Sequence, residues 1–356
     1  MPVIFDRRLA KRLDLEHPIV QAPMAGVSTP AMAAAVSNAG GLGSIGLGAA
    51  SLDQAREMIA ATKAVTDRAF NVNLFCHQPP DSHPVKEAAW LARLAPQFRH
   101  FGAEPPAELT PGNPSFLVNP AMLELLLETR PAVVSFHFGL PPAETIDALH
   151  GAGILLLATA TGPAEGRAVA EAGIDAVVAQ GIEAGGHRGI FDEDGPDDGL
   201  GVFALTRLLV RELDIPVIAA GGIMDGAGIA AVLRLGAAAA QLGTAFIAAD
   251  ESSADTAFRA ALAGEGAAHT RMVRAISGRP ARSLPTRFTA LAADLPPDEV
   301  PAFPIAYAAG RALAAAAKAA GEPGFGAQWA GQGAPMARPM AAAELVATLA
   351  EEMHAA

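Results

Sequence analysis

A histidine that directly follows two glycines marks the stretch of this chain with the clearest potential for chemistry. Gly185, Gly186 and His187 lie in a loop after an apolar run at residues 176–179, which we expect to be a buried strand. Paired glycines let a backbone turn with φ > 0 or approach another group closely. A histidine can exchange a proton near neutral pH. The loop therefore predicts a site where the backbone meets a ligand and His187 meets a reacting molecule.

Other apolar runs also end in residues that can bind a ligand. The side-chain amides of Asn73, Gln180 and Gln241 can donate and accept hydrogen bonds, as the edge of a planar heterocycle requires. Backbone N–H groups at Gly222 and at Gly243-Thr244 can bind a phosphate, especially beside a helix N-terminus. No group of cysteines and histidines has metal-ligand spacing, so we expect no metal. Together these features predict a phosphorylated heterocyclic cofactor.

The elements that must position these residues are short apolar runs that alternate with helical segments. Strands that are apolar throughout are buried on both faces, as in a parallel sheet. Eight strand–helix units predict a TIM (β/α)8 barrel, whose active site lies at the C-terminal ends of the strands. A doubly wound open sheet is the alternative, but the glycines of residues 41–46 surround a strand and not a strand-to-helix turn. The expected strands are residues 17–21, 42–45, 70–75, 132–136, 154–158, 176–180, 215–220 and 238–242.

The alternation of expected strands and helices divides the chain into three parts. Residues 1–249 are expected to form the barrel and to bind the cofactor, with a long proline-rich excursion at residues 77–120. One helix is expected in that excursion, near residues 85–94. Residues 250–304 break the alternation, and we expect a smaller, mostly helical insertion that caps the C-terminal face on the substrate side. Residues 305–356 then return to the barrel.

Composition limits the class of protein and its partners. The chain has 356 residues, of which 51% are hydrophobic and 17% charged, so a large core is possible and disorder is not expected. The net charge is −12 with no basic block, which argues against nucleic acid as a partner. No stretch reaches the roughly 18 uninterrupted apolar residues of a membrane span, and residues 1–12 lack the apolar region of a secretory signal. The single cysteine, Cys76, excludes an intrachain disulfide and is compatible with the cytoplasm, where we expect the protein.

The motifs and their order resemble the FMN-dependent nitronate monooxygenase family, formerly called 2-nitropropane dioxygenases. The resemblance runs over nearly the whole chain. Its most specific part is the loop at residues 183–187, which occurs in the right order and at the right barrel position. The stretches that carry it are residues 21–26 (QAPMAG), 39–43 (AGGLG), 73–75 (NLF), 135–139 (SFHFG), 180–189 (QGIEAGGHRG), 220–223 (AGGI), 241–246 (QLGTAF), 278–282 (GRPAR) and 329–333 (WAGQG).

The resemblance implies how the site residues divide between FMN and substrate. His187 is expected over the flavin beside the substrate. In family members that act on neutral nitroalkanes, the matching histidine is the base that removes the α-proton. An anionic nitronate needs no base, and there His187 would orient the nitro group. His137, Tyr307 and Arg311 are expected on the substrate side; for His137, packing under the cofactor and a hydrogen-bonded place in the core remain open as alternatives. The residues expected to hold FMN are Ala22, Pro23, Met24, Ala25, Gly26, Asn73, Gln180, Gly185, Gly186, Gly221, Gly222, Gln241, Leu242, Gly243 and Thr244.

The implied reaction consumes a small nitronate or nitroalkane and dioxygen. FMN takes one electron from an alkyl nitronate, such as propionate 3-nitronate, and reaction with dioxygen then gives a carbonyl compound and nitrite. One departure from the family pattern Tyr-Pro-x-x-Tyr-x-x-x-Lys bears on the substrate. Tyr307 matches, but Phe303 replaces a tyrosine and Arg311 replaces the lysine. Arginine is not a neutral replacement for lysine at an anion site, so the substrate preference can differ from that of the family.

Two other functions remain open on this scaffold. The first is an FMN-dependent NAD(P)H reductase acting on an enoyl-acyl-carrier-protein or a quinone, because those families share the Gly-Gly-His loop and the barrel. The second is a barrel without catalysis. The chain is expected to be a monomer or a homodimer. Arg279, Arg282 and the acidic run at residues 192–198 are expected in solvated loops, and Glu183 has no assigned role.

Overall fold

Parallel strands form the centre of the molecule, and helices surround them. The computed structural model describes residues 6–110, 112, 114–291 and 295–356. The central strands are β1 Ile19–Gln21, β2 Gly43–Gly46, β3 Phe70–Phe75, β4 Val133–His137, β5 Leu155–Ala160, β6 Ala176–Gln180, β8 Val217–Ala220 and β9 Ala239–Leu242. They pair in the order β1-β9-β8-β6-β5-β4-β3-β2. A parallel bridge between Val20 and Leu42 joins the two ends, so the sheet is a nearly closed barrel.

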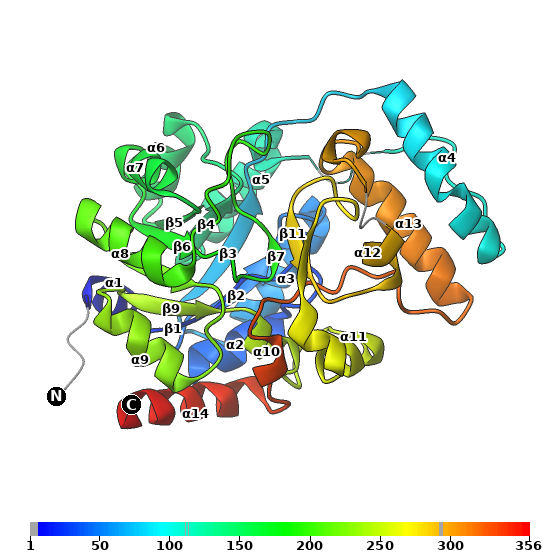
Figure 1. The fold of residues 1–356 in the computed structure, drawn as a ribbon. Coiled ribbons are helices and arrows are strands. Elements are labelled where there is room, and N and C mark those ends of the chain that lie inside the picture. The colour runs from blue at the N-terminus through cyan, green and yellow to red at the C-terminus, as the bar shows by residue number, and fades with distance from the viewer. Residues whose placement is uncertain (1–5, 111, 113, 292–294) are drawn as a thin grey trace.

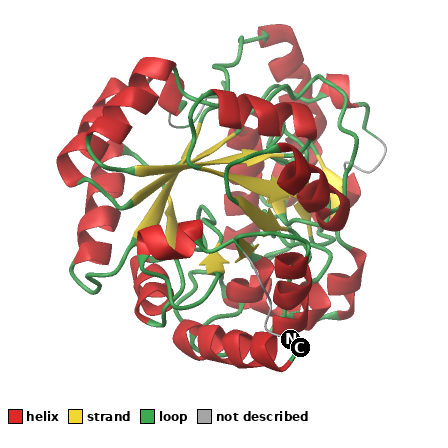
Figure 2. Cartoon of the chain, turned by 90° about the vertical axis from the view of Figure 1, so that its left-hand side faces the viewer, coloured by secondary structure: helices red, strands yellow, loops and turns green. Residues whose placement is uncertain are grey.

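The predicted TIM (β/α)8 barrel is therefore confirmed. Each strand overlaps the apolar run that predicted it, and strands such as β5 and β6 are buried along their whole length. This burial explains why the runs are apolar on both faces and not alternating. The strands lie in the middle and the helices around them in Figure 2. The bridge that joins β1 to the start of β2 rules out the open doubly wound sheet.

Helices cover the outside of the barrel. The Thr29 side chain caps one of them at Met32 N–H, and Ser51 and Gln54 form a capping box at another. The helix expected near residues 85–94 continues to His100 with Pro96 inside it. The α-helices of the barrel part are α1 Arg8–Leu13, α2 Pro30–Asn38, α3 Leu52–Lys63, α4 Pro84–His100, α5 Pro120–Thr129, α6 Ala143–Gly151, α7 Pro163–Glu171, α8 Val202–Glu212, α9 Gly226–Arg234 and α10 Thr244–Ile247, with one 3-10 turn, η1 Phe116–Val118.

The segment at residues 250–304 contains a short hairpin besides its helices. Its elements are α11 Thr256–Leu262, η2 Glu265–His269, β10 Arg271–Val273, β11 Ala281–Ser283, α12 Arg287–Leu291 and η3 Pro297–Glu299. Strands β10 and β11 pair antiparallel, and β11 also pairs with β7, which is Gly186–His187. These strands were not predicted, because two or three residues are too few to show a periodic pattern in the sequence. The hairpin brings the insertion into direct contact with the His187 loop.

The last part of the chain contacts two separate regions. It contains α13 Ile305–Ala319, η4 Ala334–Met336 and α14 Ala342–Ala355. Helix α13 packs against α4, and α14 packs against α9 and α2 on the outside of the barrel (Figure 1). The boundaries that we expect at residues 249 and 304 remain a prediction. Across the described ranges, no helix combines the length and the apolarity that a membrane crossing needs.

Candidate active site

A cavity opens where the barrel strands end. Its volume of about 360 Å³ lies in the range of roughly 300–1,000 Å³ that is usual for small-molecule sites. All the predicted site residues line it except Leu242, whose side chain is buried against the outer helices. Side chains alternate along a strand, so Gln241 faces the cavity and Leu242 faces away. The predicted residues that line the cavity are Ala22, Pro23, Met24, Ala25, Gly26, Asn73, His137, Gln180, Gly185, Gly186, His187, Gly221, Gly222, Gln241, Gly243, Thr244, Tyr307 and Arg311.

Residues near the C-terminus complete the wall of the cavity. Trp329, Gly331 and Gly333 line it, although the sequence analysis gave this stretch no site role. The Gly331 N–H donates to Thr244 Oγ1 at 2.9 Å. A Cβ on Gly331 would lie 2.6 Å from the carbonyl oxygen of Glu183, so only glycine fits at this contact. The sequence signal for this wall is the segment at residues 329–333 (WAGQG), in which two glycines follow a tryptophan. The segment is also one of the stretches that resemble the nitronate monooxygenase family.

Glycines after β8 and β9 leave backbone donors open to the cavity. Gly221 and Gly222 have φ angles of 119° and 69°, which glycine adopts without strain. The backbone N–H groups of Gly222 and Gly243 meet no hydrogen-bond acceptor in the part of the chain that is described. A Cβ on Gly243 would come within 3.5 Å of the Ala22 side chain. Unpartnered N–H groups with no Cβ to cover them fit a phosphate group.

The backbone of His187 is held from both sides. Strand β7 pairs with β11, where His187 lies opposite Ala281. On the barrel side, Gln180 Nε2 donates to the carbonyl oxygen of His187 at 3.0 Å, and His137 Nε2 lies 3.2 Å from the same oxygen. Gln180 Oε1 accepts from Gly189 N–H at 2.8 Å. Gln180 therefore lines the cavity with both ends of its amide already bonded to the His187 loop.

Both ring nitrogens of His137 also have partners. Nδ1 lies 3.0 Å from Thr159 Oγ1. Since the carbonyl oxygen of His187 can only accept, Nε2 of His137 carries the proton and Nδ1 accepts from Thr159. Burial lowers the pKa of His137 to about 4, against the opposing effect of its hydrogen bond to His187. His137 is thus a neutral residue that supports His187 and offers the cavity the surface of its ring.

The ring of His187 borders the cavity within a group of aromatic side chains. Its centroid lies 5.1 Å from that of Trp329, 5.3 Å from Phe303, 5.6 Å from Phe138 and 6.1 Å from Tyr307. The residue is partly exposed, and it lines the cavity. Burial is the main reason why the pKa of His187 falls to about 3, and nearby positive groups add to the effect. His187 is therefore neutral at physiological pH.

Phe138 connects several of these rings and has no role in the sequence analysis. It follows β4 with a φ of 73°, a left-handed conformation that costs a non-glycine residue on the order of 1 kcal/mol. This turn places its ring 4.8 Å from the ring of Phe75. The guanidinium carbon of Arg279 lies 4.3 Å from the centroid of the Phe138 ring, which is a cation–π contact. The strained turn thus builds the apolar wall beside His187.

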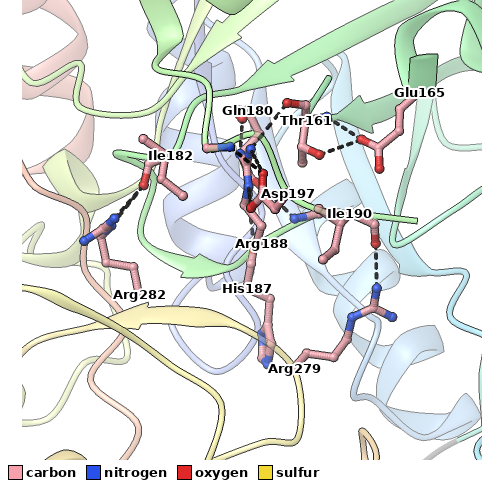
Figure 3. A network of polar contacts seen from close by, with 12 residues as sticks. Thr161, Glu165, Gln180, Ile182, His187, Arg188, Ile190, Asp197, Arg279 and Arg282 are labelled. Atoms are coloured by element: carbon pink, nitrogen blue, oxygen red, sulfur yellow. Dashed lines mark hydrogen bonds and ion pairs between the residues drawn. The ribbon is translucent and has the colours of Figure 1, made fainter. Parts of the chain in front are cut away.

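Arg188, next to His187, is buried and paired with the acidic loop. Its side chain is 1% exposed, and its Nε and Nη2 donate to the two carboxylate oxygens of Asp197 at 2.8 and 2.9 Å. It also donates to the carbonyl oxygens of Gln180 and Thr161, as Figure 3 shows. Asp197 remains exposed, as expected for the acidic run, but its carboxylate also pairs with the buried guanidinium of Arg188. The carboxylate of Asp197 compensates the charge of this buried guanidinium, and only the folded chain shows that the two groups meet.

Arg279 and Arg282 are also buried, so their expected place in a solvated loop is wrong. They are 3% and 6% exposed. Arg279 donates to the carbonyl oxygen of Ile190, and Arg282 donates to that of Ile182 at 2.8 and 3.0 Å (Figure 3). The hairpin covers the His187 loop, and its arginines satisfy carbonyl groups that would otherwise be buried without donors.

Glu183, which had no assigned role, anchors a helix. Both of its carboxylate oxygens lie 3.0 Å from the backbone N–H of Val202, the first residue of α8. A carboxylate stabilises the positive end of a helix and satisfies one of its free N–H groups. Glu183 thus ties the His187 loop to the start of α8.

Comparisons with known proteins agree with this geometry. The sequence model of the nitronate monooxygenase family matches residues 6–352. A nitronate monooxygenase of Paraburkholderia phytofirmans is 60% identical over 347 residues, which cover 98% of this chain and 95% of that protein. One of Pseudomonas aeruginosa is 53% identical and covers 98% and 99% of the two chains.

A solved structure agrees as well. The nitroalkane oxidase from Streptomyces ansochromogenes superposes with a TM-score of 0.90 at 43% identity and covers 98% of each chain. The family match extends over nearly the whole chain, and the structural likeness includes the barrel that carries the cavity. The resemblance found in the sequence is confirmed: the chain belongs to the nitronate monooxygenase family, and it is an oxidoreductase.

Proposed function

We propose that the protein uses FMN to oxidise alkyl nitronates, such as propionate 3-nitronate, with dioxygen to a carbonyl compound and nitrite. The observation that carries the proposal is the place of His187. Its neutral imidazole borders a cavity whose walls include glycines and side-chain amides at the ends of the barrel strands. Membership of the nitronate monooxygenase family supports the same reaction.

The cavity offers suitable groups for FMN. The open N–H groups of Gly222 and Gly243, with the start of α10 at Thr244, would hold the phosphate. Residues 22–26, Asn73 and the other cavity-lining residues after the strands would surround the ring system. Bound FMN would supply the capacity to accept electrons from the nitronate and to pass them to dioxygen. The family consists of flavoenzymes in general, and FMN is our choice because of the phosphate cradle.

The low pKa of His187 favours a substrate that is already an anion. A nitronate has lost its α-proton, so its oxidation needs no base. A neutral nitroalkane must lose that proton in the site, and an imidazole with a pKa of about 3 is a weak base. We therefore expect nitronates to react faster than the corresponding nitroalkanes, and only the nitroalkane reaction to depend on proton uptake by His187.

Tyr307 and Arg311 favour a substrate with a second negative group. Arg311 is exposed at the edge of the cavity, and its guanidinium carbon lies 5.2 Å from the centroid of the Tyr307 ring. A guanidinium binds a carboxylate through two parallel hydrogen bonds. The carboxylate of propionate 3-nitronate suits this position, while a simple alkyl nitronate would use only the aromatic wall.

Oxygen uptake and nitrite release test the proposal. The purified protein is assayed in air with propionate 3-nitronate and with ethyl nitronate, and its flavin is released and identified. Uptake with nitrite formation supports the proposal. A second portion is mixed with NADH without oxygen. If both nitronates fail while NADH bleaches the flavin, the reductase alternative is correct. If the protein contains no flavin and takes up none, the barrel without catalysis is correct.

Replacement of His187 separates its possible roles. We expect His187→Asn to keep its FMN, because the cofactor's expected contacts come mainly from backbone groups, and to turn over neutral nitroalkanes more slowly. Oxidation of added nitronates should change less, since no proton is removed there. Loss of bound FMN in this variant would mean that His187 is a structural residue, and the assignment of a role toward substrate would fail.

A further inference from the structure

A buried serine links the ring of His187 to the backbone of the insertion. Ser277 is fully buried, and its Oγ lies 2.9 Å from His187 Nε2. The same Oγ lies 3.2 Å from the carbonyl oxygen of Arg279. Nδ1 of His187 makes no hydrogen bond within the part of the chain that the structure describes. Ser277 does not line the cavity, so its effect must reach the site through His187.

Ser277 has a single hydroxyl proton, and the partner that receives it determines the donor and the acceptor in both hydrogen bonds. A carbonyl oxygen can only accept, so the contact with Arg279 is a hydrogen bond only if Ser277 donates to it. Ser277 then has lone pairs left, and His187 must donate to them from Nε2. If Ser277 donated to His187 instead, its oxygen would face the Arg279 oxygen at 3.2 Å with no proton between them. Buried polar groups that fail to pair are costly, so the first arrangement is favoured.

Hydrogen bonds and close packing hold the backbone around Ser277 in place. Ser277 and Gly278 donate their N–H groups to the carbonyl oxygen of Arg274 at 3.2 and 2.8 Å. Gly278 has a φ of 97°, and a Cβ there would lie 2.5 Å from the backbone nitrogen of Phe303. The turn is thus packed directly against the chain that precedes α13. The buried side chain of Arg279, bonded to Ile190, holds the accepting carbonyl in place.

We propose that Ser277 is a positioning residue that keeps His187 in the tautomer with the proton on Nε2, so that Nδ1 is the nitrogen that accepts from a ligand. The inference rests on the proposed function in that the ligand is the substrate of this cavity. For a neutral nitroalkane the step is balanced within the site. The Cα–H bond breaks and the proton goes to Nδ1. The electron pair of that bond forms the C=N bond, and the π pair of one N=O bond moves onto its oxygen, which gives the nitronate. For an added nitronate, no such step is needed.

The tautomer can be measured without any turnover. The FMN-loaded protein is labelled with 15N-histidine, and the ring nitrogens are observed by NMR at neutral pH. His187 is identified by comparison with His187→Asn. We expect a protonated Nε2 and an unprotonated Nδ1 in the wild type. Ser277→Thr, which keeps a hydroxyl, should retain this pattern. Ser277→Ala should shift His187 toward a mixture of tautomers. The matched control is Ser283→Ala, because Ser283 is also fully buried but its hydroxyl lies, among the described residues, beside the carbonyl oxygens of Leu284 and Gln328 and not beside His187.

Kinetics give an independent outcome. In Ser277→Ala we expect kcat/KM for a neutral nitroalkane to fall by about tenfold, the rate equivalent of one lost hydrogen bond. The value for the matching nitronate should stay within about twofold of wild type, and Ser277→Thr should recover most of the loss. A proton on Nδ1 in the wild type, or equal losses for both substrates, would overturn the inference. If the wild type oxidises no nitronate, the proposed function fails instead, and the NMR result still reports the tautomer.

Discussion

The ion pair between Arg188 and Asp197 gives the sharpest test of how the His187 loop is held. We consider Asp197→Asn, which keeps the size of the side chain and removes its charge. The side chain of Arg188 is 1% exposed and that of Asp197 is 26% exposed. The amide would keep one acceptor, but its NH2 group would face a donor of the guanidinium. Arg188 would retain its bonds to two carbonyl oxygens, those of Gln180 and Thr161, without a neutralising charge.

The expected loss follows from this burial. Removing one partner of a fully buried pair costs about 3–5 kcal/mol, because the remaining charge is left uncompensated. The partial exposure of Asp197 lets water replace some of the lost interaction, so we expect the free energy of unfolding to fall by about 2 kcal/mol. At roughly 2.1 cal/mol/K per residue, the 356 residues have an unfolding entropy of about 0.75 kcal/mol/K, so the Tm should fall by about 3 °C.

The pH dependence has a definite sign. The hydrogen bond from Arg188 is the main cause of the lowered pKa of Asp197 in the folded protein. A carboxyl group with a lowered pKa stabilises the fold above its unfolded value, which is about 3.9 for aspartate. That contribution is lost as the pH falls through the folded pKa. The difference between wild type and Asp197→Asn should therefore be full at pH 7 and should shrink in acid below about pH 4.

Unfolding in urea, followed by circular dichroism at several pH values, measures this difference. Asp198→Asn is the matched control, because Asp198 is the next residue, is exposed and has no ion pair among the described residues. We expect the control to change stability by less than about 0.5 kcal/mol. Equal stabilities of the two variants at pH 7 would refute the reasoning. A difference that grows in acid would show that the stabilisation does not come from the ionised carboxylate.

Two further substitutions test the contacts around the same loop. A Cβ on Gly185 would lie 2.5 Å from Gly331 N and 2.6 Å from the carbonyl carbon of Ala330. Gly185→Ala should therefore lower both the Tm and the amount of flavin bound per chain. The control Gly151→Ala should change neither, because a Cβ there would meet open space. Glu183→Gln should lower the free energy of unfolding by about 1 kcal/mol through the weakened contact with the first turn of α8, and an unchanged urea midpoint would contradict this.

Much of the barrel could be predicted from the sequence because each strand is a local pattern. A run such as residues 154–158 is apolar at every position, which is compatible only with burial on both faces. The order of strands and helices then fixed which residues share the C-terminal face. The glycines after β8 and β9 were found for the same reason, since their positions follow directly from the strands that precede them. Leu242 was assigned to the site by position in a motif, although the alternation of side chains places it on the other face.

The amino-acid sequence by itself determined the barrel, the face that carries the site and the place of His187 on that face. Only the tertiary structure decided what surrounds the imidazole. Ser277 and His187 are 90 residues apart, and the pairing of β7 with β11 depends on where the insertion folds back onto the barrel. The burial of Arg188, Arg279 and their partners has the same origin. Local residue patterns record how a segment folds, whereas a hydrogen bond between distant segments depends on packing that no single segment encodes.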